Sequence, residues 1–174
     1  MTPAYRTPTP ADASALVALG RETFTATFGH LYPPEDLQTF LEEAHNPETI
    51  RTRLADPARR YRVAQAAGQM VGFCHLAPLK LPLHDQPAPA LELSQLYVLP
   101  DWLGAGIGPA LMDWALEQAR GAGVRSLVLS VYSENYRAQR FYQRYGFEKY
   151  ADYEFHVGRV VDAEYLMCKS FPPS

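Results

Sequence analysis

Three glycines, Gly104, Gly106 and Gly108, carry the first chemical signal in this sequence. They follow the run Leu91–Val98, which is rich in β-branched, aromatic and leucine residues, and they precede apolar residues at helical spacing. Such a turn leaves backbone N–H groups uncovered at the positive end of a helix dipole, where a phosphate or pyrophosphate can bind. The alternative is an ordinary tight turn, because glycine also serves backbone conformations with positive φ where no ligand binds.

Two nucleotide-binding motifs can be tested against this turn. A Walker A loop ends in Gly-Lys-Ser/Thr, but here Gly108 is followed by Pro109 and Ala110. A dinucleotide fingerprint needs its last glycine where Pro109 stands and normally opens a series of βαβ units, whereas this turn lies past the middle of the chain. The Walker motif is therefore excluded, and the dinucleotide fingerprint is disfavoured.

A second set of residues stands further along the chain. The stretch from Asn135 to Phe147 reads N-x-x-A-x-x-F-Y-x-x-x-G-F, and Asn135, Ala138 and Tyr142 fall on one face of a helix. Together with LYVLPDWLGAGIGPALM, this stretch resembles the GNAT superfamily of N-acetyltransferases. In that family a strand ending in a V-x-P-like sequence leads into the coenzyme A loop. Both motifs stand in the family's order, and the resemblance covers roughly residues 60–170.

The resemblance implies an α/β (α+β) fold of three layers in a single domain, residues 1–174. We expect a central mixed, mostly antiparallel sheet of about seven strands, with helices on both faces and a splay between the two central strands. The strand and helices of about residues 1–58 are expected to cover the acceptor side, and about residues 60–170 to form the acetyl-CoA-binding core.

The resemblance also implies acetyl-CoA as co-substrate. The five histidines show no H-x-x-x-H or Cys/His ligand spacing, so we expect no metal. The pantetheine arm would lie in the splay and pair with the backbone of Leu96 and Val98, and the Val98 N–H would donate to the thioester oxygen as it becomes negative. The family's Gln or Arg at the head of the loop is Leu103 here, and Arg144 is a candidate to supply the missing charge. The positions expected to contact the cofactor are Leu96, Tyr97, Val98, Leu103, Gly104, Ala105, Gly106, Ile107, Gly108, Asn135, Ala138 and Arg144.

The implied reaction is a direct attack of an amine on the acetyl thioester in a ternary complex. An aliphatic amine has a pKa of about 10.4, so its deprotonation at neutral pH costs roughly 4–5 kcal/mol and a base is useful. Glu92 is the candidate base, acting through water, and a carboxylate that only meets solvent at a strand end fits equally well. Tyr142 is the candidate acid for the departing thiolate. The alternative is a core aromatic, and its place in the Phe-Tyr pair favours the catalytic role.

The region TFTATFGHLYPPEDLQTFLEE is expected to choose the acceptor, and it resembles the start of the bacterial PaiA-like spermidine/spermine acetyltransferases. Phe28 and Tyr32 are candidates to line a pocket, and Glu35 is a candidate to attract the ammonium groups of a polyamine. Large aromatics are more often core residues, and acids at a helix start are more often a solvated face.

The elements that must position these residues follow from capping residues and apolar spacing. A strand is expected at the N-terminus, and a loop is expected over Pro78–Pro89. The predicted helices begin near Pro10 and run over Pro34–Ala44, Pro47–Ala55, Ala105–Arg120 and Asn135–Tyr145, and the further predicted strands are Tyr61–Ala66, Met70–Leu76, Leu91–Val98, Val124–Val131, Phe147–Val157 and Ala163–Ser170.

Composition limits the partners and the compartment. The 174 residues are 47% hydrophobic and 20% charged with a net charge of −3, which is typical of one globular domain. The sequence has no basic block for nucleic acid, no apolar run long enough to cross a bilayer and no signal-peptide pattern. We therefore expect a cytoplasmic protein without nucleic-acid or membrane partners, in which Cys74 and Cys168 are free buried thiols.

Three functions remain open at this point. The leading hypothesis is an N-acetyltransferase acting on the primary amine of a small molecule, polyamines being a subset. The second is a protein Nα- or Lys-acetyltransferase, whose peptide acceptor would need an open groove. The third is a non-catalytic acyl-CoA-binding sensor, which Leu103 suggests and Tyr142 opposes. The family resemblance also leads us to consider a homodimer.

Overall fold

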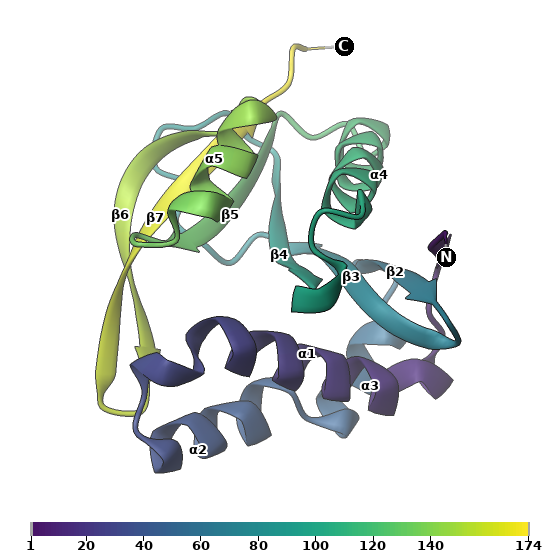
Figure 1. Ribbon diagram of the computed structural model, residues 1–174. Helices are drawn as coiled ribbons and strands as arrows, with labels where there is room; N and C mark the ends of the chain where they lie inside the picture. The colour runs from purple at the N-terminus through teal and green to yellow at the C-terminus, as the bar shows by residue number, and fades with distance from the viewer. Residues whose placement is uncertain (1, 174) are drawn as a thin grey trace.

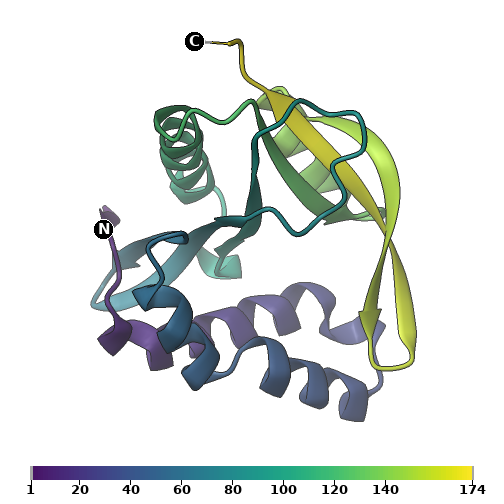
Figure 2. The ribbon, with the colours of Figure 1, turned by 180° about the vertical axis from the view of Figure 1, so that it is seen from behind.

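The computed structural model describes residues 2–173, which form one central sheet with helices on both faces (Figures 1 and 2). The predicted three-layer arrangement is confirmed. None of the helices between residues 2 and 173 combines the length and apolar character that crossing a membrane requires. In chain order the elements, with η marking a 3₁₀ helix, are β1 (Ala4–Arg6), η1 (Pro10–Asp12), α1 (Ala13–Phe28), η2 (Gly29–Leu31), α2 (Pro34–Ala44), α3 (Pro47–Ala55), β2 (Arg60–Ala66), β3 (Gln69–Pro78), β4 (Ala90–Val98), η3 (Pro100–Trp102), α4 (Ile107–Gly121), β5 (Ser126–Tyr132), α5 (Tyr136–Arg144), β6 (Glu148–Val157) and β7 (Val160–Ser170).

The sheet of the described chain has seven strands in the order β1-β2-β3-β4-β5-β7-β6. Neighbouring strands pair antiparallel except for β4 and β5, which run parallel. The sheet is therefore mixed and mostly antiparallel, as predicted. Parallel neighbours require a long crossover connection, and here α4 provides it.

Several elements begin or end one to three residues from their predicted bounds, and two of these differences have a local backbone reason. Helix α4 begins at Ile107 rather than near Ala105, because Gly106 has a φ of 83° and so lies outside the right-handed helical region. Strand β5 begins at Ser126 rather than Val124, because the Arg125 N–H donates to the carbonyl of Pro89 at 2.7 Å and not to a ladder partner.

The two helical layers bury different faces of the sheet. Helix α4 turns Ile107, Leu111 and Ala115 towards β3 and β4, and these side chains are at most 1% exposed. On the opposite face, α1 packs Leu16 and Leu19 towards β3. Each fully buried aliphatic side chain of this size contributes about 1.5–3 kcal/mol, so the two layers hold the sheet from both sides.

The central strands separate soon after they meet. Within the described residues, β4 and β5 are in register at three positions, Ala90 with Ser126 through Glu92 with Val128. Beyond Glu92 the register between β4 and β3 also shifts, because Leu93 faces Leu76 and Gln95 faces His75, which leaves Ser94 as an extra residue. Such a bulge bends a strand and increases its twist. The bulge thus stands where β4 turns away from β5, and the predicted splay is present.

The hairpin of β6 and β7 extends past the other strands and packs on α2 and η2 (Figure 1). Phe155 meets Phe40 edge-on with ring centroids 5.5 Å apart, and Arg159 lies 3.4 Å from the carboxylate of Asp36. The hydroxyl of Tyr32 donates to Asp162 of β7. These contacts join the helices of the first third of the chain to its last two strands.

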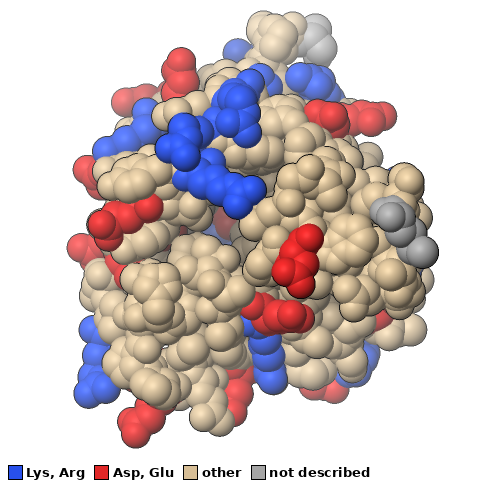
Figure 3. Space-filling model, viewed as in Figure 1, with Lys and Arg blue, Asp and Glu red and all other residues tan. Residues whose placement is uncertain are grey.

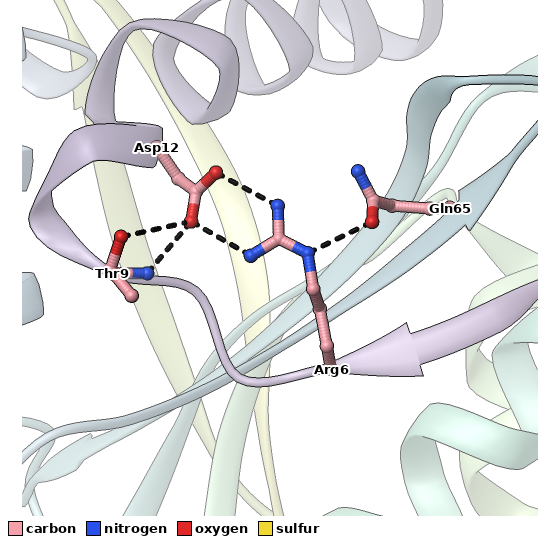
Figure 4. Close-up of polar contacts among 4 residues, drawn as sticks. All are labelled: Arg6, Thr9, Asp12 and Gln65. Carbon is pink, nitrogen blue, oxygen red and sulfur yellow. Dashed lines mark hydrogen bonds and ion pairs between the residues drawn. The ribbon is translucent and has the colours of Figure 1, made fainter.

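A cluster of hydrogen bonds among Arg6, Thr9, Asp12 and Gln65 holds the N-terminal strand in place (Figure 4). Both oxygens of Asp12 accept from the guanidinium of Arg6, at 2.8 and 2.9 Å, while the Arg6 Nε donates to Gln65 of β2 at 2.8 Å. Asp12 also accepts from the Thr9 N–H at 2.7 Å. The hydrogen bonds from Arg6 hold the pKa of Asp12 down to about 2.

Replacing this carboxylate should lower stability in a pH-dependent way. Because the folded-state pKa of Asp12 is depressed from 3.8, its contribution is present above the unfolded value and is lost as pH falls through about 2. We expect Asp12→Asn to cost about 1 kcal/mol near neutral pH, since it weakens a cap and a partly exposed ion pair. Urea unfolding should show the gap from wild type closing between about pH 4 and pH 2. The exposed Asp85→Asn control should show no such gap, and an equal loss in both variants would contradict the prediction.

Candidate active site

The glycine turn has the backbone geometry of an anion-binding loop. It follows η3, and Gly104 and Gly106 have φ values of 86° and 83°, which L side chains rarely adopt. An added Cβ would meet no atom within 4 Å at either glycine, so it is the backbone conformation and not crowding that calls for glycine. The turn leads directly into the N-terminus of α4, a helix of 15 residues.

Most amides of this turn have no internal partner. Within residues 2–173 no hydrogen bond is found for the N–H groups of Gly104, Gly106, Ile107 and Gly108. Ala105 differs, because its N–H donates to the Trp102 carbonyl at 3.3 Å. Ala105 stays a predicted contact of the cofactor, but its amide already has a backbone acceptor. The remaining four amides stand at a helix N-terminus, which attracts anions.

Leu103 and Arg144 lie near the two ends of this region. Leu103 is 45% exposed at the head of the loop and offers no charge. The guanidinium of Arg144 lies 5.7 Å from the ring centroid of Phe141, and this ring lies against Gly108, where an added Cβ would come within 3.6 Å. The Phe141 ring thus lies between the Arg144 guanidinium and the start of α4. Figure 3 shows the basic surface over α5 and, below it, a hollow in the same face.

Beyond the bulge, the backbone N–H and C=O groups of β4 point alternately towards β3 and away from it. The Leu99 N–H donates to the Val71 carbonyl at 2.9 Å, and Val98 faces Gly72 in the antiparallel register. Since bonded and unbonded pairs alternate, the N–H and C=O of Val98 and Leu96 point away from β3, into the splay. Those of Tyr97 instead point to β3. Tyr97 therefore stands apart from its two neighbours, and its ring packs on Phe73 at 5.5 Å, on the face that α1 covers.

Helix α5 brings the second motif to the splay. The Asn135 side chain caps the helix by accepting from the Ala138 N–H at 3.2 Å. Tyr142 packs against Phe147, with ring centroids 5.8 Å apart, and within the described residues no hydrogen bond is found for its hydroxyl. Burial raises the pKa of Tyr142, and the charges of Cys74, Tyr97 and Glu164 raise it further. The phenol is thus protonated, free to donate, and close to three strands.

Glu92 lies on a different part of β4 from Leu96 and Val98. It belongs to the part of β4 that is still paired with β5, opposite Val128. Its Oε1 accepts from the N–H groups of Lys80 and Leu81, each at 3.0 Å. The structure therefore uses this carboxylate to hold the loop before β4 and does not group it with Tyr142.

The acceptor-side candidates divide in a similar way. Phe28 meets Tyr132 edge-on at 6.1 Å, and Tyr32 is 8% exposed and donates to Asp162, so both lie beside β5 and β7. Glu35 is exposed in the first turn of α2, and within residues 2–173 no hydrogen bond or ion pair joins it to these strands. Tyr32 and Phe28 are thus brought together, and Glu35 is not.

Sequence reasoning missed Glu164 of β7. Its Oε1 accepts from the Ser130 hydroxyl at 2.7 Å, and burial raises its pKa to about 7, with the Asp162 charge adding to the rise and the Ser130 hydrogen bond opposing it. The available signal was weak, because Asp162 and Glu164 stand two apart and so share one face of a strand. Charged residues on a strand face are ordinary where that face meets solvent.

Comparisons with known proteins agree with this geometry. A model of the Acetyltransferase (GNAT) family matches residues 20–147. The chain is 31% identical over 158 residues to an uncharacterized N-acetyltransferase of Mycobacterium bovis, covering 91% of this chain and 97% of that protein. It is 26% identical over 159 residues to an uncharacterized N-acetyltransferase of Lactobacillus delbrueckii subsp. lactis, covering 91% and 92%. The structure of PaiA N-acetyltransferase from Thermoplasma acidophilum in complex with coenzyme A has a similar fold, with a TM-score of 0.80 at 21% identity over 98% of this chain and 100% of that one.

A single methyl group in the turn should weaken anion binding. In Gly106→Ala the residue must keep a positive φ, which costs roughly 1–2 kcal/mol for an L side chain. We expect coenzyme A to bind about tenfold more weakly, measured by titration calorimetry. Gly121→Ala is the matched control, because Gly121 ends α4 with an open Cβ position and no positive φ. The control should bind like wild type, and equal losses in the two variants would exclude the turn as the reason.

Proposed function

This chain belongs to the GNAT family of acetyltransferases, and on that premise we propose that it transfers the acetyl group of acetyl-CoA to the primary amine of a small molecule. Polyamines are one subset of such amines. The observation that carries the proposal is the separation of β4 and β5 beyond Glu92, directly beside a turn with four free amides. We propose that the diphosphate binds at the turn and that its thiol-bearing arm enters the separation between the strands.

The cofactor's place follows from these two features. The free amides of the turn would bind the pyrophosphate, with Arg144 contributing charge in the place of Leu103. The gap-facing backbone of Leu96 and Val98 would pair with the amides of the pantetheine arm, as an added strand does. Asn135 and Ala138 would border the arm from α5. We propose the same division for the domain, with about residues 60–170 holding acetyl-CoA and about residues 1–58 covering the acceptor.

Chemistry in this cleft requires a free amine, an oxyanion donor and a proton for sulfur. The amine nitrogen attacks the thioester carbon, and the resulting oxyanion accepts from the Val98 N–H. Collapse of this intermediate expels the coenzyme A thiolate, which receives its proton from the Tyr142 phenol. Glu92 was the base suggested by sequence. With Oε1 held by two loop amides, it would act only through a water on its other oxygen.

The acceptor side favours a small molecule over a peptide. The β6–β7 hairpin meets α2 through Phe155 with Phe40 and Arg159 with Asp36, and it meets Tyr32, which follows η2, through Asp162. These contacts hold the hairpin against the first helices, and we propose that they leave no open groove for a peptide acceptor beside β5. The proposal therefore ranks a small amine above a protein acceptor.

Two further expectations concern the setting of the reaction. Cys74 and Cys168 are free and buried, which suits a reducing compartment, and we place the protein in the cytoplasm on that basis. The family resemblance suggests a homodimer, which sedimentation at several protein concentrations would detect.

Thiol release from acetyl-CoA tests the proposal directly. The purified protein is incubated with acetyl-CoA and each member of a panel that includes alkylamines, spermidine and peptides with free α- or ε-amines. We expect thiol release with small amines above the rate without acceptor, and an acetylated amine in the product by mass spectrometry. Release with peptides alone would move the assignment to a protein acetyltransferase. Tight coenzyme A binding without release would make the chain a sensor.

Removing the Tyr142 hydroxyl should test its role as general acid without changing the fold. The Tyr142 hydroxyl has no hydrogen bond within the described residues, so Tyr142→Phe should keep the fold and the affinity for coenzyme A. We expect kcat to fall about 100-fold at neutral pH, the low end for loss of a general acid, because a thiolate is already a fair leaving group. Rapid-quench measurement of thiol release gives this rate. Tyr145→Phe, one turn on and packed on Phe141 at 5.1 Å, is the control and should retain wild-type kcat. Wild-type release by Tyr142→Phe across pH would remove Tyr142 from the chemistry.

A further inference from the structure

The carboxylate of Glu164 lies at the rim of the splay. On β7 it faces Tyr132 of β5 and Tyr153 of β6 in register, and it accepts from Ser130 of β5 at 2.7 Å. Ser130 and Tyr132 belong to the part of β5 that has already left β4. Glu164 thus shares with them the face of the sheet on which Phe28 packs against Tyr132.

Groups on both sides of the splay are close enough to respond to this charge. It raises the pKa of Tyr97 on β4, of Tyr142 on α5 and of Tyr132 on β5. Glu164 is therefore within electrostatic reach of the phenol assigned to protonate the thiolate. By contrast, Glu92 has no part in the pKa shift of Tyr142.

This carboxylate has no cation to balance it. Among residues 2–173 no lysine, arginine or histidine forms an ion pair with Glu164. The ionisable groups around it are anionic or neutral, namely Asp162 on its own strand and the tyrosines Tyr32, Tyr97, Tyr132, Tyr142 and Tyr153 from the surrounding elements. A partly buried carboxylate in such surroundings is stabilised by an added cation, and the acceptor ammonium is one.

We infer that Glu164 is the general base of the reaction and the first contact of the acceptor's ammonium group. This inference rests on the proposed function and deepens it, because it assigns the acceptor to the class of protonated primary amines. Glu164 is partly exposed, so a ligand can reach it from the face of the sheet on which Phe28 packs against Tyr132.

Each proton and each bond of the step can be accounted for. The ammonium N–H bond breaks and its proton moves to Glu164, which leaves a neutral amine beside the thioester. The nitrogen then forms a bond to the carbonyl carbon, and the C–S bond breaks with its electron pair going to sulfur. Tyr142 gives its proton to sulfur and regains one from the acylated nitrogen, while Glu164 releases its proton to solvent. One ammonium and one acetyl-CoA thus give one amide, one thiol and one proton.

The pH profile distinguishes this base from a structural carboxylate. Burial raises the pKa of Glu164 to about 7, so kcat/KM of the wild type should rise with pH up to about that value and then level off. In Glu164→Gln only the unprotonated fraction of the amine can react, so kcat/KM should keep rising towards the amine pKa of about 10. At neutral pH we expect the variant to be about 100- to 1,000-fold slower. The amide oxygen of glutamine can still accept from Ser130, which preserves this contact in the fold.

Ethylamine and trifluoroethylamine provide the decisive pair of acceptors. They are nearly equal in size, but the fluorines keep the second amine unprotonated at neutral pH, so it needs no base. We expect Glu164→Gln to be strongly impaired with ethylamine, and with spermidine, and nearly wild type with trifluoroethylamine. Equal impairment with both amines would show a structural role and overturn the inference.

Two companion variants complete the experiment. Glu154→Gln on β6, whose side chain is 72% exposed, is the matched control and should keep the wild-type profile. Glu92→Gln tests the other candidate base. If the rise of kcat/KM up to about pH 7 disappears in Glu92→Gln but remains in Glu164→Gln, the inference is overturned. If the wild type acetylates none of the amines, the proposed function fails and the base assignment falls with it. If the wild type is active and Glu164→Gln keeps its profile, only the base assignment fails.

Discussion

The separation of β4 from β5 is the constraint on which the rest of this structure depends. Parallel strands normally pair along their length, because each unpaired and buried backbone group costs about 1–3 kcal/mol. Here the described strands pair at three positions and then part at a bulge at Ser94. The cores on both faces hold the parted strands in place, since α4 packs on β4 and β3 from one side and α1 on β3 from the other. The unpaired backbone of Leu96 and Val98 is thereby kept available for an extended ligand.

The two sides of this opening are built on different physical principles. On the side proposed for the cofactor, the conformation comes from a few consecutive residues, in which two glycines with positive φ lead into a helix N-terminus. On the acceptor side, nothing is local. Tyr32 and Asp162 are 130 positions apart in sequence, and Asp36 meets Arg159 across a similar interval. A rigid, local cofactor site and an acceptor site assembled from distant segments would let relatives change acceptors while keeping the cofactor.

Charge is distributed to match these two sides. The exposed arginines of α5 and the free amides of the turn are positive where a diphosphate would bind. Behind them, Asp162 and Glu164 place negative charge among tyrosines on the face that α1 covers. If both groups bind as we propose, the diphosphate and the ammonium group reach the opening from opposite faces of the sheet. This separation allows a thioester and an ammonium group to meet at the splay.

The sequence by itself determined the local elements of this protein, including the turn that we propose binds the cofactor. The predicted bounds of α2 and α3 agree with the structure at both ends, and the strand–turn–helix at Gly104–Gly108 and the Asn135 cap were also predicted. These features depend on backbone preferences and caps that act within a few residues, so they can be read from a short stretch. Only the tertiary structure shows how the surroundings of the two strand carboxylates differ. Glu92 and Glu164 are both acids on strands, but one is held by the amides of Lys80 and Leu81, and the other stands beside Ser130 at the rim of the splay. Such environments arise from pairing between distant segments, which no local pattern encodes.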